Sequence, residues 1–115
     1  MANLISLRNT MQAKRNRLYF SKVELGEILF AYSNGVIKGH WKDYAIDQNG
    51  TTSIFSIYRN SRENATFTLT KRQLKNGHIF NFELLYRSKS LESSTSLDKV
   101  LTRLASLPKI AKSYQ

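Results

Sequence analysis

Residues 80–86 read Phe-Asn-Phe-Glu-Leu-Leu-Tyr, and residues 66–70 read Thr-Phe-Thr-Leu-Thr. In both stretches an apolar side chain stands at every second position, the spacing that places side chains on one face of a β-strand. The same period joins two earlier pairs, Tyr44 with Ile46 and Phe55 with Ile57. The region from Trp41 to Arg87 therefore predicts four strands, each with an apolar face.

The segments between these strands have the composition of turns. Asn49-Gly50 separates the first pair of strands and Asn76-Gly77 the third, and Asn-Gly is a preferred pair in tight hairpins. A polar stretch, residues 60–64, separates the second pair. Because consecutive hairpins place each strand beside the next, we expect an antiparallel meander.

A helix is predicted before the strands. Residues 21–24 (Ser-Lys-Val-Glu) form a capping box, in which Ser21 and Glu24 satisfy each other's backbone N–H groups. Gly39 can supply the left-handed stop, although Asn34-Gly35 inside the span would suit an earlier end or a kink. The apolar stripe of this helix consists of Leu25, Ile28, Leu29, Tyr32 and Val36.

A second helix is predicted after the strands. Residues 88–96 are rich in serine and are expected to form a loop, in which Thr95 or Ser96 can cap the helix. Pro108 is expected to end it. Its apolar side carries Leu97, Val100, Leu101 and Leu104.

These elements predict a single α+β domain over residues 18–108. It consists of a four-stranded antiparallel meander with an N-terminal and a C-terminal helix packed on one face. Residues 1–17 hold four basic residues and no acidic one, so we expect a flexible basic tail there. Residues 109–115 are expected to form a C-terminal tail.

The chain is strongly basic. Its 18 Lys and Arg against 8 Asp and Glu give a formal net charge of +10, which an anionic partner such as a nucleic acid or an acidic protein would neutralise. Alternatively, the charge only keeps the protein soluble. The chain has no cysteine, and no apolar run approaches the roughly 20 residues of a membrane span, so we expect a cytoplasmic protein without membrane contact.

The sequence contains no recognisable catalytic or metal-binding pattern. Without cysteine it lacks a thiolate nucleophile, and its two histidines, His40 and His78, do not stand at metal-ligand spacing. Asp43 and Asp47 would lie on the same side of a strand, where two acids can share acid–base work or bind a metal ion. Capping and turn roles are commoner for such residues. We therefore predict no enzyme activity, no cofactor and no metal.

Two pairs of neighbours place an aromatic ring beside a cation. Trp41-Lys42 and Tyr58-Arg59 each combine a ring that can stack on an unstacked base with a cation that can bind a phosphate. A tryptophan between a helix and a strand is, however, better suited to fill the core. We assign a structural motif to Trp41, Asp43, Tyr44 and Asp47. The candidate nucleic-acid-binding residues are Lys42, Tyr58, Arg59, Arg62, Lys71, Arg72, Lys75 and Arg87.

The leading hypothesis is a non-enzymatic binding module for single-stranded DNA or RNA. Its helix-free sheet face, with Ile54, Ser56, Tyr58 and the threonines of the third strand, would meet the nucleic acid between basic side chains. The alternative is a protein-interaction or regulatory subunit, which could be a homodimer. A hydrolase that uses Asp43 and Asp47 is a third hypothesis.

Two further motifs carry a family resemblance. Residues 39–47 read Gly-His-Trp-Lys-Asp-Tyr-Ala-Ile-Asp, and residues 55–59 read Phe-Ser-Ile-Tyr-Arg. The preceding helix adds, in register, Phe20, Glu24, Leu25, Ile28, Leu29 and Tyr32. Over residues 18–72 the chain resembles the DUF2794 family of short alphaproteobacterial proteins of unknown function. The resemblance implies a bacterial cytoplasmic protein and supplies no activity, so it assigns no catalytic residue.

Overall fold

The computed structural model describes residues 17–60, 64–74, 77 and 79–113, with side chains up to Leu107. Within them the chain forms two helices and five strands. In order these are α2 (Lys22–Ile37), β1 (Asp43–Asn49), β2 (Thr52–Tyr58), β3 (Phe67–Gln73), β4 (Phe80–Tyr86), β5 (Lys89–Ser94) and α3 (Leu97–Ser113). The predicted α+β class is confirmed.

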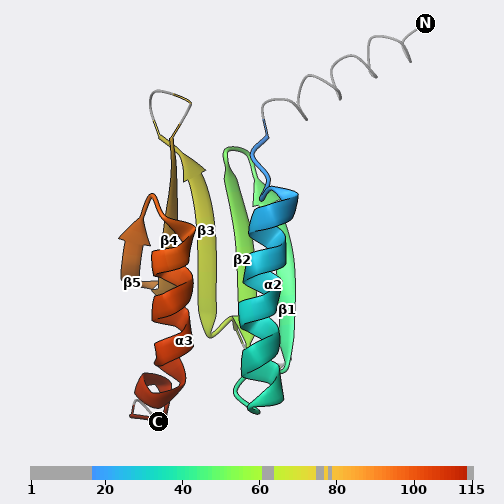
Figure 1. Ribbon diagram of the computed structural model, residues 1–115, viewed down its shortest axis with the longest axis vertical. Coiled ribbons are helices and arrows are strands. Elements are labelled where there is room, and N and C mark those ends of the chain that lie inside the picture. The colour runs from blue at the N-terminus through green and yellow to red at the C-terminus, as the bar shows by residue number, and fades with distance from the viewer. Residues whose placement is uncertain (1–16, 61–63, 75–76, 78, 114–115) are drawn as a thin grey trace, which may run out of the picture.

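The five strands form one sheet in the order in which they occur along the chain. The order is β1-β2-β3-β4-β5 and every neighbouring pair is antiparallel, which confirms the predicted meander. Both helices lie side by side on the same face of the sheet (Figure 1). The fold is therefore a two-layer sandwich in which one sheet face is covered by α2 and α3 and neither helix lies on the other.

The prediction of four strands followed by a serine-rich loop was wrong, because residues 89–94 form the edge strand β5. The turn between β4 and β5 contains only Arg87 and Ser88, and both have a positive φ, 46° and 74°. Two consecutive residues of positive φ characterise the tightest hairpin turns, where glycine and asparagine are usual. Neither occurs here, so the turn has no sequence signature.

Helix α2 begins and ends where the sequence predicted. The Glu24 N–H donates to the Ser21 hydroxyl over 3.1 Å, and the Ser21 N–H donates to Glu24 Oε1 over 2.7 Å. At the other end Gly39 has a φ of 79° and terminates the helix. Asn34-Gly35 does not interrupt it; instead, the bare Cα of Gly35 makes room for the Trp41 ring.

Helix α3 is longer than predicted. It runs from Leu97 to Ser113 and so passes Pro108, at which the sequence predicted its end. Proline inside a helix removes one backbone donor and crowds the preceding turn, so it usually kinks or ends the helix, but here the helical backbone continues past it. Residues 109–113, expected as a tail, therefore extend this helix.

The core lies between the helices and the covered face of the sheet. Alternate residues of the central strands point into it, as Phe55 with Ile57 and Phe67 with Leu69 show, and Ile28, Tyr32, Val100 and Leu104 meet them from the helices. The predicted apolar stripes thus form the interior, apart from Val36, which is exposed. Among the residues described here, no helix is both long and apolar enough to cross a membrane.

Candidate functional site

The uncovered sheet face is more acidic than the sequence led us to expect. The strand register places Asp47, Ile54, Thr70 and Glu83 in one row across it. The next row contains Ala45, Ser56, Thr68 and Leu85. The middle of this face therefore combines apolar and small polar side chains with two carboxylates, which would repel a phosphate backbone.

Four of the eight candidate binding residues gather at one end of the sheet. The backbone N–H of Lys42 donates to Tyr58 O over 2.9 Å, and that of Arg87 donates to Thr66 O over 3.1 Å. The Thr66 N–H in turn donates to Ile57 O, so the start of β3 lies between the strand ends that carry Arg59 and Arg87, and Lys42 lies on the other side of Arg59. At a strand spacing of about 4.8 Å, the backbones of Lys42 and Arg87 lie about 15 Å apart.

Lys89 joins this group, because it pairs with Tyr86 across the β4–β5 turn. We call Lys42, Arg59, Arg87 and Lys89 the basic end. Two tyrosines lie among these cations: Tyr58 is half-buried on the uncovered face, and the Arg87 guanidinium stands 5.8 Å from the centre of the Tyr86 ring. The sequence already groups Lys89 with Arg87 after the last predicted strand, where both could meet phosphates, but it does not predict the turn that brings Lys89 back beside Tyr86.

Two of the other four candidates, Arg72 and Lys71, do not join the basic end. Arg72 is exposed at the opposite end of the sheet, where it pairs with Thr52 and Asn81. Arg62 and Lys75 lie outside the described residues. Lys71 is only 4% exposed and lies under the helices, so it cannot reach a phosphate on the surface.

Lys71 instead holds together three parts of the chain. Its ammonium group lies 2.7 Å from Glu24 Oε1, donates to Tyr19 O over 3.0 Å and stands 4.4 Å from the centre of the Phe80 ring. It thereby joins β3 to the start of α2 and to the segment that enters it. Because an unpaired buried charge is costly, this lysine depends on Glu24 for its place in the interior.

Opposing effects set the pKa of Glu24. Burial acts to raise it, but the hydrogen bond from Lys71, the hydrogen bond from the Ser21 backbone and the Lys71 charge outweigh burial and hold the pKa below its ordinary value of 4.5. A lowered pKa in the folded state stabilises the fold above the unfolded value, and this stabilisation is lost as the pH falls through the folded value.

We expect Glu24→Gln to remove this pH-dependent contribution to the stability of the fold. Above pH 4.5 the wild type should be more stable than the variant, and the difference should shrink steadily as the pH falls below 4.5, because protonated glutamate and glutamine are both neutral. Urea unfolding of both proteins between pH 6 and pH 3 measures the difference. A difference in stability between the two proteins that is the same at every pH would contradict the lowered pKa of Glu24.

Three residues of the predicted structural motif, Trp41, Asp43 and Tyr44, lie where the chain passes from α2 into β1. Trp41 is 4% exposed and stacks on Tyr32 with ring centres 6.1 Å apart, while Tyr44 stacks on Phe55 at 5.1 Å. Asp43 Oδ1 accepts a hydrogen bond of 2.8 Å from the Tyr44 N–H. Burial, followed by the nearby carboxylate of Asp43 and by Tyr44, raises the pKa of Tyr32.

Asp47 does not join Asp43 in a metal site. It is exposed on β1, where its strand partner is Ile54. Within the described part of the chain, no three His, Asp or Glu side chains come together in a way that could hold a metal ion. His40 lies near Trp41, and His78 is outside the described residues.

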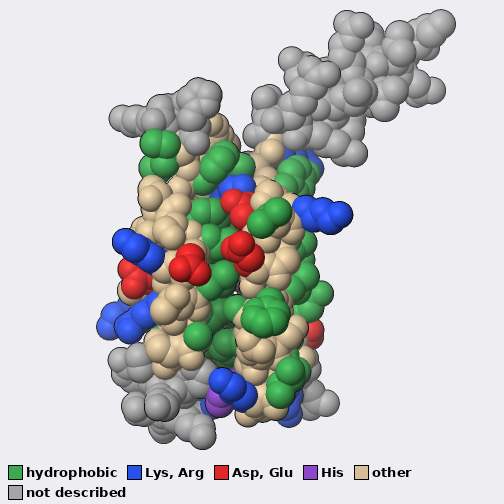
Figure 2. Space-filling view, viewed as in Figure 1, with side chains coloured by type: hydrophobic (Ala, Val, Ile, Leu, Met, Phe, Trp, Pro, Cys, Tyr) green, Lys and Arg blue, Asp and Glu red, His purple; other side chains and the backbone are tan. Residues whose placement is uncertain are grey.

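A groove separates the two helices on the covered side of the sheet. It has a volume of about 1180 Å³ and is lined from both helices, by Gly26, Ala31 and Gly35 of α2 and by Leu101 and Ala105 of α3 among others. Its floor is hydrophobic in Figure 2, with acidic side chains along the upper half and a histidine and a basic side chain at the lower end.

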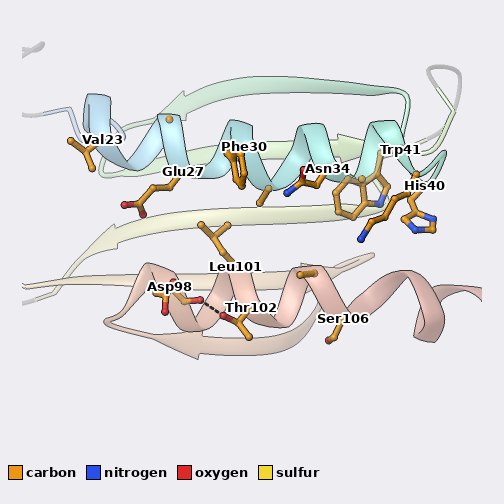
Figure 3. Close-up of a pocket in the computed structure, with 15 residues that line it drawn as sticks. Val23, Glu27, Phe30, Asn34, His40, Trp41, Asp98, Leu101, Thr102 and Ser106 are labelled. Carbon is orange, nitrogen blue, oxygen red and sulfur yellow. Dashed lines mark hydrogen bonds between the residues drawn. The ribbon is translucent and has the colours of Figure 1, made fainter.

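The residues that line the groove are polarised along its length. Glu27 and Asp98 lie toward the end where both helices begin, and His40 lies at the other end beside Trp41 (Figure 3). Lys38 also lines that second end as the C-cap of α2. Between them Phe30 projects from α2 with 71% of its surface exposed. No pattern in the sequence predicts the groove, because its existence depends on how far apart the helices pack.

The fold and its surface define a small basic α+β domain, with two helices on one face of a five-stranded meander, a polarised groove and a basic end. The chain belongs to the DUF2794 family, described as a protein of unknown function, which matches residues 18–101. This match extends past residues 18–72 and includes β4, β5 and the start of α3. No curated protein and no solved structure matches the chain significantly.

Proposed function

We propose that the domain is a non-enzymatic module that binds single-stranded nucleic acid at its basic end. The observation that carries this proposal is the convergence of Lys42, Arg59, Arg87 and Lys89, which come from three separate parts of the sequence. Grouped cations repel one another, and a phosphate backbone that lies across them neutralises the repulsion.

The aromatic side chains at this end favour single strands over duplexes. Tyr58 presents its ring on the uncovered face at this end of the sheet, opposite its strand partner Asp43, and unstacked bases stack on such rings. The carboxylates of Asp47 and Glu83 make the middle of the face unfavourable for phosphates. The ligand therefore crosses one end of the sheet and contacts only a few phosphates.

Binding should depend steeply on salt. If Lys42, Arg87 and Lys89 each neutralise one phosphate, the logarithm of the affinity for a single strand falls with a slope of about −2.1 against the logarithm of salt concentration, or roughly 20-fold between 50 and 200 mM salt. Fluorescence anisotropy with labelled single-stranded and duplex oligonucleotides measures this slope. Binding that is absent at 50 mM salt, or that salt does not weaken, would reject the proposal.

Paired variants locate the site within the same experiment. Lys42→Gln and Arg87→Gln should each weaken binding by about tenfold, because each removes a charged hydrogen-bond donor. Each should also reduce the salt slope by about 0.7. Lys22→Gln, an exposed lysine at the opposite end of the molecule, serves as the matched control. Equal losses for Lys22→Gln or Arg72→Gln would contradict a site at the basic end, and equally tight binding to polyglutamate would indicate an acidic protein as the partner.

A further inference from the structure

We propose that the groove between α2 and α3 is the interface of a homodimer, in which two copies pack antiparallel through their helices. None of the four residues of the basic end lines the groove. The proposal therefore stands independently of nucleic-acid binding.

One stripe of α2 carries the features of an interface. Glu27 and Lys38 both line the groove and lie about three helical turns apart, roughly 16 Å along the axis. Phe30 and Asn34 lie between them on the same stripe. The helix thus presents a negative charge, an exposed ring and a positive charge in a line.

This line is complementary to itself when it is reversed. A two-fold axis that crosses the groove at the midpoint between Glu27 and Lys38 places Glu27 of each copy opposite Lys38 of the other. Two identical ion pairs result, as a two-fold interface requires. A two-fold axis that runs along the groove would instead lay α2 of each copy over α3 of the other and bring Glu27 to the end where the other copy's Asp98 lies, so like charges would meet.

The same two-fold axis explains why the ring of Phe30 is exposed in the monomer. It brings Phe30 of one copy to the level of Gly35 of the other, so the two rings enter the joined grooves about 7.5 Å apart along the helix axis. This separation is slightly longer than the roughly 4.5–7 Å between the centres of interacting rings, so the two rings lie side by side without clashing. Ala31 and Ala105 leave the space that these rings fill. An aromatic side chain that is 71% exposed in the monomer thereby becomes buried.

The area of the face formed by the two helices suits a dimer of moderate affinity. α2 has 16 residues and is about 24 Å long, and two adjacent helices are roughly 20 Å across. The projected face is then about 500 Å², below the roughly 800 Å² per partner of a standard interface. We therefore expect a dissociation constant in the micromolar range.

Charge reversal tests the dimer and its direction together. Sedimentation equilibrium between 1 and 500 μM should show a monomer–dimer equilibrium for the wild type. Glu27→Lys or Lys38→Glu alone should weaken it at least tenfold, because like charges then meet at both symmetric contacts. The double reversal should restore the dissociation constant to within about threefold. Phe30→Ala should weaken the dimer at least tenfold while leaving the monomer folded.

Controls separate the interface from general effects of charge. Lys22→Glu alters an exposed residue of the same helix outside the groove and should leave the equilibrium unchanged. A wild type that stays monomeric at 500 μM would overturn the proposal. So would a dimer that Glu27→Lys and Phe30→Ala leave intact. Weakening by both single reversals without rescue by the double reversal would overturn the antiparallel arrangement.

Discussion

Replacement of Gly35 by alanine should lower the free energy of unfolding by about 3 kcal/mol, the upper part of the range for overpacked cores. An alanine Cβ at this position would lie 2.0 Å from Cε3 and 2.1 Å from Cζ3 of Trp41. Carbon atoms in contact normally stay at least 3.5 Å apart. The ring cannot retreat without disrupting its stack on Tyr32 and its edge contact with Phe67, so helix and ring must separate.

Gly26 of the same helix provides the matched control. A Cβ there would meet nothing within 4 Å, so Gly26→Ala should stabilise the protein by about 0.8–1 kcal/mol through helix propensity alone. Urea unfolding followed by the fluorescence of Trp41, the single tryptophan, measures both variants. Equal and small effects of the two substitutions would show that the Trp41 ring is not packed against Gly35.

The second large effect should come from the ion pair of Glu24 and Lys71. Glu24→Ala leaves the Lys71 ammonium group buried without its counter-ion and should cost about 3–5 kcal/mol. Loss of the carboxylate that caps Ser21 adds to this destabilisation. Lys71→Met should cost less, because the side chain of Glu24 retains 21% exposure and can recover water.

A double-mutant cycle distinguishes the pair from its separate parts. Glu24→Ala combined with Lys71→Met removes both charges, and it should regain more than half of what Glu24→Ala alone loses, because no unpaired charge remains inside. Lys22→Met, the same change at an exposed lysine, should stay within about 0.5 kcal/mol of the wild type. Additive effects of the two substitutions would show that the charges do not depend on each other.

Local chemistry made much of the fold predictable. The capping box of Ser21 and Glu24, the stop at Gly39 and the period of two in the strands each determine a short stretch of chain without help from the rest. The fifth strand escaped prediction because its turn, Arg87-Ser88, adopts positive φ angles with side chains that rarely do so.

The placement of Lys71 could have been inferred from the sequence. It follows Phe67 and Leu69 at the same period of two, so the alternation already assigns it to the covered face. It was grouped with the surface cations because of its charge. What the pattern could not supply was Glu24, a counter-ion 47 positions away that makes burial of the lysine possible.

The candidate sites were only partly predictable, for a topological reason. A meander brings the start of β1, the end of β2 and the end of β4 to one end of the sheet, so the meeting of Lys42, Arg59 and Arg87 follows from the strand order. The groove does not follow from any such rule. It depends on how far apart α2 and α3 pack, which the side chains beneath them determine jointly.

The two outermost strands bear on how the protein behaves at high concentration. β1 and β5 form the edges of the sheet, and each carries charged side chains: Asp43 and Asp47 on β1, Lys89 and Glu92 on β5. Charges on an edge strand discourage other chains from adding to the backbone ladder, which is the first step toward fibrous aggregates. Copies of this protein are thereby steered away from open-ended stacking.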